Sequence, residues 1–113
     1  MRPGQLHPNE FEVAILDRLN AAYPDLRLAA ADLHVVSREF TGVGSFSNFL
    51  VRGRPKAERR ALNIPAYVSI PGLVGDLGLV AFFEGDSLTI EAFAAGGEWW
   101  DGVFEGFTIY PPA

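Results

Sequence analysis

The fold of this chain is decided by the stretch LGLVAFFEGDSLTIEAF, residues 77–93. Two apolar runs, 77–83 and 87–93, flank Glu84-Gly85-Asp86, an arrangement typical of two antiparallel strands joined by a short turn. In the first run both alternating sets of residues are largely apolar, which predicts a strand inside the sheet rather than at its edge. The stretch therefore predicts a central β-hairpin.

Outward from this hairpin, β-branched and aromatic runs predict the other strands. These strands are 33–40 and 46–51 around the glycine-containing turn 41–45, 66–70 before Pro71-Gly72, and 103–110 near the C-terminus. The intervening segment 53–63 is charged and contains a proline, so we expect an exposed loop there.

The N-terminal part has helical periodicity. Asn9 followed by Glu12 is a helix-start signature, and apolar residues then recur three or four positions apart. Pro24 stops the helix because it lacks an amide and restricts the residue before it. The sequence thus predicts one α+β domain over 1–113, with an N-terminal helix at roughly 9–22 packed on an antiparallel sheet of about five or six strands.

Composition indicates a folded chain. Of 113 residues, 49% are hydrophobic, which supplies enough apolar surface to offset the entropy of ordering one domain. There is no cysteine, so a disulfide framework, a thiolate metal site and a thiol nucleophile are excluded. No apolar run approaches the roughly 20 residues of a membrane span, and the first residues do not resemble a signal peptide. We expect a cytoplasmic protein with no membrane partner.

Charge is segregated along the chain. Five of the nine basic residues lie between Arg52 and Arg60, and no lysine or arginine follows Arg60, whereas the net charge is −5. An acidic chain is a poor candidate for nucleic-acid binding. Because the basic segment and the acidic second half are complementary, we expect contact with another protein or with a second copy, as a homodimer that salt weakens.

Three segments carry a resemblance to a known group. They are Arg38-Glu39-Phe40-Thr41-Gly42-Val43-Gly44-Ser45-Phe46, Gly78-Leu79-Val80-Ala81-Phe82-Phe83 and Ile90-Glu91-Ala92-Phe93. Together they resemble a family of small bacterial proteins described as hypothetical or uncharacterised, in which an Arg-Glu-x-Thr-Gly-x-Gly-x-Phe element precedes a glycine-initiated apolar hairpin. The resemblance covers roughly 33–100 and implies a bacterial source but no activity. This chain departs from the family pattern Glu-Gly-aromatic-Thr-Tyr-Gly, in place of which it has Glu91-Ala92-Phe93-Ala94-Ala95-Gly96-Gly97.

Three charged residues on predicted strands are candidate binding residues: Arg38, Glu39 and Glu91. Because Arg38 and Glu39 are adjacent in a strand, their side chains point to opposite faces, and Glu91 is a candidate partner for Arg38. If the three met in a cleft, they would form a small-molecule pocket or a minor hydrolase site. The alternative is that Arg38 forms a structural ion pair and Glu91 faces solvent.

The adjacent pair Trp99-Trp100 is a second candidate. Neighbouring side chains of an extended chain point in opposite directions, so one ring would enter the core and the other would be exposed beside Glu98 and Asp101 as a partner surface. The alternative is that both rings cover the core at the sheet edge.

Other chemistry has little support in the sequence. His7 and His34 lack a second ligand at metal-like spacing, and no serine lies in a nucleophile-elbow context. The glycines of 41–45 suit a tight turn better than an anion site. We therefore expect no metal, no cofactor and no catalysis, and a protein-binding or self-associating module. A toxin-neutralising protein is a further alternative, suggested by the acidic second half.

Overall fold

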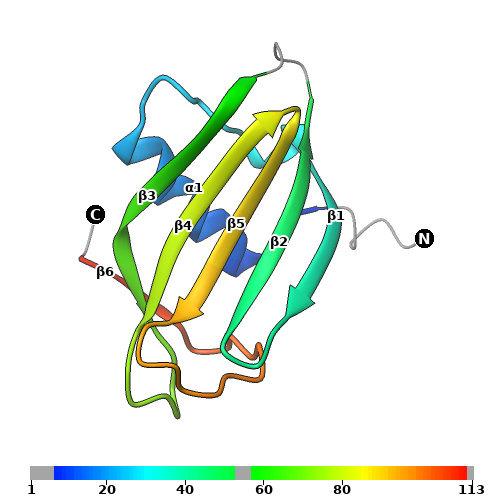
Figure 1. The fold of residues 1–113 in the computed structure, drawn as a ribbon. Helices are drawn as coiled ribbons and strands as arrows, with labels where there is room; N and C mark the ends of the chain where they lie inside the picture. The colour runs from blue at the N-terminus through cyan, green and yellow to red at the C-terminus, as the bar shows by residue number, and fades with distance from the viewer. Residues whose placement is uncertain (1–6, 53–56, 112–113) are drawn as a thin grey trace.

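The computed structural model describes residues 7–52 and 57–111. Figure 1 shows two layers, in which helix α1 (Glu10–Ala22) crosses one face of a six-stranded antiparallel sheet. The sheet order is β1-β2-β5-β4-β3-β6, and no other described helix or strand covers the opposite, outer face. The strands are β1 (Leu33–Phe40), β2 (Gly44–Val51), β3 (Ala57–Ser69), β4 (Leu77–Gly85), β5 (Ser87–Ala94) and β6 (Thr108–Tyr110). The predicted α+β class is confirmed.

Helix α1 begins and ends where the sequence predicts. The side chain of Asn9 accepts a hydrogen bond from the backbone amide of Glu12, and the Glu12 carboxylate accepts one from the backbone amide of Asn9. The two bonds make a complete capping box. Tyr23 forms the C-cap, directly before Pro24. No helix in the described part of the chain is long and apolar enough to cross a membrane.

The core lies between α1 and the inner face of the sheet. Alternate residues of β3, β4 and β5 are buried, and they pack against the apolar stripe of the helix. The predicted hairpin is β4–β5, and β4 lies inside the sheet between β5 and β3. On the outer face, the ring of Phe93 lies over Gly78, where an added Cβ would approach a ring carbon to 2.5 Å.

One predicted loop and one predicted strand are wrong. Within the predicted loop 53–63, residues 57–63 form the first half of β3, because Leu62 is buried between exposed neighbours and pairs with Ala81 of β4. Residues 53–56 lie outside the described part of the chain. The predicted last strand, 103–110, is regular only over Thr108–Tyr110, because turns at Gly102 and Gly106, both with positive φ, interrupt it.

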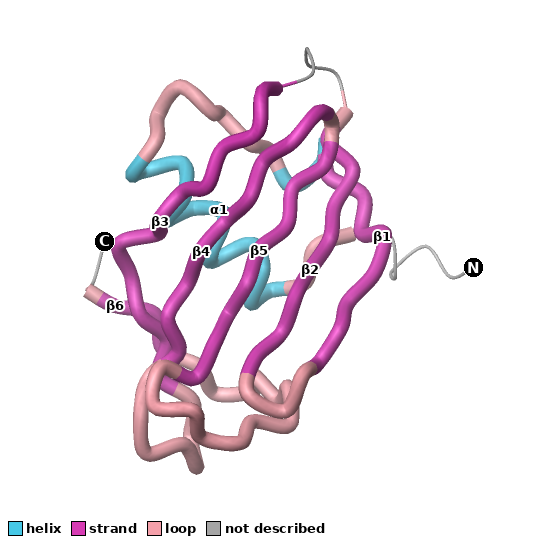
Figure 2. The backbone as a smooth tube through the Cα atoms, viewed as in Figure 1, coloured by secondary structure: helices cyan, strands magenta, loops and turns pink. Residues whose placement is uncertain are grey.

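Three connections gather at one end of the sheet, drawn in pink at the lower end of Figure 2. They are the β1–β2 turn (41–43), the β3–β4 segment (70–76) and the β5–β6 segment (95–107), which we call the loop end. The Trp100 amide donates to the Gly42 carbonyl at 2.8 Å, and the Ala94 amide donates to the Val43 carbonyl at 2.7 Å. These bonds fix the β5–β6 segment against the β1–β2 turn.

Candidate functional site

The structure does not bring Arg38, Glu39 and Glu91 together. Glu39 pairs with Phe46 of β2, which in turn pairs with Glu91 of β5, so both carboxylates belong to the outer face with a phenylalanine between them. Arg38 pairs with buried Ser47 and faces α1. The expected contact between Arg38 and Glu91 is therefore wrong, and so is a cleft built from these three residues.

A β-bulge puts Arg38 on the inner face. Leu33 and Val35 face the core, and strict alternation would send Ser37 and Glu39 there as well. The register shifts between Val35 and Ser37, which leaves Val36 as the extra residue and turns Arg38 inward.

Inside, Arg38 forms an ion pair with Glu12 of the capping box. Its Nε donates to Glu12 Oε2 at 2.9 Å and its Nη2 donates to Oε1 at 2.7 Å, while only 1% of Glu12 is exposed. The hydrogen bond to Glu12 raises the pKa of the Arg38 guanidinium, although burial of the group opposes that rise. The structural ion pair, which the sequence left as an alternative, is the arrangement observed, and its partner Glu12 was recognisable only as a cap.

The cavity beside this ion pair is too small for a metabolite. It measures about 50 Å³ and is lined by Ser45, Ser47 and aromatic rings of the loop end and helix start. Ligand pockets usually measure roughly 300–1,000 Å³, so this space suits a few water molecules. The small-molecule site expected from Arg38 has no room here.

One tryptophan is buried and the other is exposed, as the first interpretation predicts. Trp100 is 2% exposed, and its Nε1 donates to the Val103 carbonyl at 2.9 Å, whereas Trp99 is 68% exposed. The alternative, that both rings cover the core, is wrong. The Trp99 ring lies next to Gly42, where an added Cβ would contact its atoms at 3.5 and 3.6 Å. The indole of Trp100 thus anchors the β5–β6 segment, and the indole of Trp99 is left exposed to solvent.

Several exposed apolar side chains share the loop end with Trp99. Most of the large apolar side chains that the described residues expose belong to the loop end or to the last residue of β1, and we call this group the Trp99 patch: Phe40, Val43, Val74, Trp99 and Val103. Strand periodicity missed the three valines, although each is next to a glycine in a turn, where no core position is available. That placement is a signal that sequence reasoning can use.

A cavity opens beside the patch, on the side of the β3–β4 segment. It measures about 250 Å³. Its walls come from 70–73 and from 99–101 with Val103, and the carboxylates of Asp101 and Glu105 line it. Neither carboxylate forms an ion pair within the described residues.

Glu98 braces the loop end. Its carboxylate accepts the amide of Val74 at 2.9 Å and the amide of Gly75 at 3.0 Å, which ties the β5–β6 segment to the β3–β4 segment. These two backbone hydrogen bonds lower the pKa of Glu98, so the group stays ionised.

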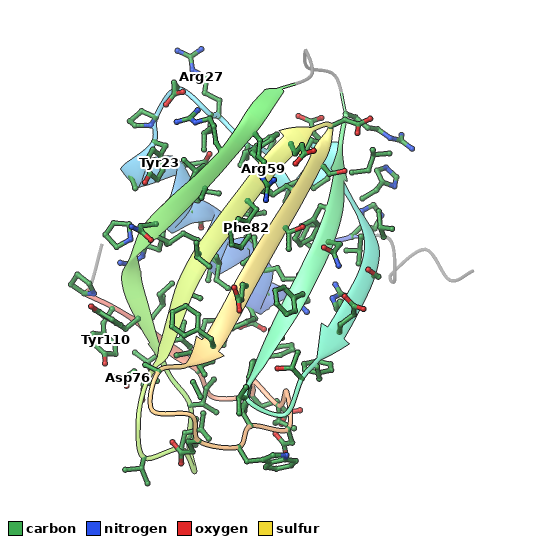
Figure 3. All side chains as sticks on the ribbon, in the orientation of Figure 1. Tyr23, Arg27, Arg59, Asp76, Phe82 and Tyr110 are labelled. Atoms are coloured by element: carbon green, nitrogen blue, oxygen red, sulfur yellow. The ribbon has the colours of Figure 1, made fainter. Side chains whose placement is uncertain are left out.

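The outer face of the sheet has a second hollow. Figure 3 shows Arg59 and Phe82 on this face, and they line a space of about 320 Å³ together with Glu84, Ser87 and Thr89. Arg59 lies 3.7 Å from Glu84, and Arg60 lies 3.7 Å from Asp25. Two arginines of the basic segment therefore have partners within their own chain, at the end of the sheet opposite the loop end.

Comparison with models of known protein families, with curated proteins and with solved structures found no match.

Proposed function

We propose that the protein is a non-enzymatic binding module of a bacterial cytoplasm, and that it docks another protein at the Trp99 patch. The exposure of Trp99, 68% of its surface, next to a fully anchored Trp100 is the observation that carries the proposal. Tryptophan is enriched among residues that dominate interface energetics, and clustered exposed apolar groups mark such interfaces.

The patch is also held in place before any partner arrives. The Trp100 ring packs against Phe11 and Phe40 at centroid distances of 6.3 and 6.2 Å. Together with the Trp100–Gly42 and Glu98–Val74 hydrogen bonds, these contacts connect the segments that carry the patch. A preordered surface loses less conformational entropy on binding, which favours affinity.

The test is photo-crosslinking in cells that produce the protein. We expect p-benzoylphenylalanine at position 99 to give a discrete crosslinked protein, whereas the same group at position 36 gives none. Val36 is a matched control, because it is 69% exposed but lies on the bulge of β1, away from the loop end. Equal crosslinking at both positions, or none at position 99, would contradict the proposal.

A second copy of the chain is one partner that this proposal includes. The described arginines Arg52, Arg59 and Arg60 lie at the opposite end of the sheet from the acidic loop end, so charge complementarity would join two copies head to tail. Light scattering tests this: a molar mass that rises with protein concentration and falls with salt supports self-association, and a constant monomer mass contradicts it.

Neutralisation of a basic toxin is a second candidate function, and the acidic loop end favours it. Co-expression of this protein would then rescue the growth of cells that produce the toxin of a neighbouring gene, and co-expression of the Trp99→Ala variant would not. Equal rescue by both chains would remove the Trp99 patch from this role.

A further inference from the structure

We propose that the cavity beside Trp99 receives an arginine side chain of the docked protein. This inference rests on the proposed function and adds the chemistry of the partner. It follows from the size of the cavity and from the acidic and tryptophan residues that line it.

The cavity has the size of one long side chain. Its volume of about 250 Å³ is bounded by the turn at 70–73 on one side and by the segment 99–103 on the other. An entire helix or strand does not fit such a space, whereas a single side chain from a docked surface does. The apolar walls from Ile70 and Leu73 suit the methylene stem of a long cationic residue, which packs along apolar surface with its charge at the polar end.

The charges that line the cavity are all negative. Asp101 uses Oδ1 to accept the Val103 amide at 3.0 Å, and no hydrogen bond from the described residues reaches its Oδ2. Glu105 also lines the space, and Glu98 adds a fixed negative charge nearby. Since 41–43, 70–76 and 95–107 contain no lysine or arginine, nothing in the loop end neutralises these carboxylates. An incoming anion would be repelled, and an incoming cation would be attracted.

Arginine suits this combination better than lysine does. A guanidinium group stacks on an indole face and at the same time donates two parallel hydrogen bonds to a carboxylate. Trp99, which is 68% exposed, and the acidic residues Asp101 and Glu105 line the same cavity, so one side chain can reach both kinds of group. The partner is thus a protein segment in which an arginine lies between apolar residues that contact the Trp99 patch.

The probe is a fluorescein-labelled peptide of sequence Gly-Leu-Arg-Leu-Arg-Leu-Gly, compared with the same peptide carrying citrulline in place of arginine. Citrulline keeps the shape of arginine and removes its charge. We expect fluorescence polarisation at low salt to show about tenfold tighter binding of the arginine peptide, as expected for a charge-assisted contact. Equal binding of the two peptides, or no binding of either, overturns the proposal.

Variants localise the contact. Trp99→Ala and the double variant Asp101→Asn/Glu105→Gln should each weaken binding of the arginine peptide by about tenfold, because they remove the ring and the charges separately. Asp17→Asn, on the exposed side of α1, is the control for loss of a single acidic charge and should leave binding unchanged. An equal loss of affinity in Asp17→Asn would show that net charge alone attracts the peptide, and would overturn the site.

The two proposals fail separately. Photo-crosslinking at position 99 without discrimination between arginine and citrulline leaves the docking surface in place and removes the arginine site. Absence of crosslinking at position 99 removes the docking surface itself.

Discussion

At the scale of single residues, the buried carboxylate of Glu12 belongs both to the helix cap and to an ion pair. The carboxylate accepts hydrogen bonds from the Asn9 amide and from two nitrogens of Arg38, and only 1% of the residue is exposed. Removing its charge leaves the partly buried guanidinium of Arg38 without its carboxylate partner, so we expect Glu12→Gln to lower the free energy of unfolding by about 2–4 kcal/mol. Urea denaturation measures this change.

The control for that change is Glu10→Gln, an exposed residue in the same first turn, with an expected effect within about 0.5 kcal/mol. The double variant Glu12→Leu/Arg38→Met should recover part of the loss, because a matched apolar pair replaces both charges. Equal stability of the two single variants would show that the ion pair does not stabilise the fold.

Glu98 predicts a pH dependence of the loop end. Its pKa is lowered in the folded protein by hydrogen bonds from Val74 and Gly75. A carboxylate with a lowered pKa stabilises the fold above its unfolded pKa, about 4.3, and this contribution is lost as the pH falls through the folded pKa. Amide exchange at Val74 and Gly75 should therefore be faster in acid than the intrinsic pH dependence predicts, and faster at neutral pH in Glu98→Gln. Unchanged protection in that variant would contradict the bracing role.

At the scale of elements, the bulge in β1 decides which charged residue meets the helix. Deleting Val36, the extra residue, makes Val35 and Ser37 neighbours in a regular ladder and keeps Arg38 facing α1 and Glu39 facing outward. We expect this deletion to change the free energy of unfolding by less than about 1 kcal/mol, because the ion pair is kept and an exposed, unpaired residue is lost. Thermal or urea denaturation measures the change.

Val36→Ala is the control, since it shortens an exposed side chain and keeps the bulge, and its effect should stay within about 0.5 kcal/mol. A deletion that is far more destabilising than the point substitution would show that Arg38 does not keep its position opposite Ser47 once Val36 is gone.

The sequence predicted the elements whose signals are local. The capping box at Asn9 and the stop at Pro24 define α1, and the turn at Gly85 defines the β4–β5 hairpin. The first half of β3 was missed, because its charged residues hide the alternation that begins at Leu62. The faces of Arg38 and Glu39 were also unpredictable, since a single bulge inverts them and pattern alone does not locate bulges. Trp99 was identified because the divergence of adjacent side chains is a local rule.

At the scale of the whole molecule, the acidic loop end should be detectable through the fluorescence of Trp99. Trp100 is buried, so external quenchers reach Trp99 preferentially. Because acidic groups surround this ring, we expect caesium to quench it more efficiently than iodide at low salt, after normalisation to a free tryptophan derivative. The difference should shrink near 1 M salt, where the screening length is about 3 Å.

In Trp99→Phe the remaining fluorescence, from Trp100, should respond little to either ion. A stronger response to iodide than to caesium in the unmodified protein would contradict a negative potential at the loop end.

The absence of lysine and arginine from the loop end has a practical consequence for finding a partner. Amine-reactive crosslinkers and biotin reagents have no side chain to attach to there, since the only lysine of the chain is Lys56. Trypsin releases everything after Arg60 as a single long peptide, which mass spectrometry recovers poorly. A complex formed at the Trp99 patch would leave no trace in a lysine-based interaction map, so carboxyl-directed coupling and digestion after acidic or aromatic residues are the chemistries that would record it.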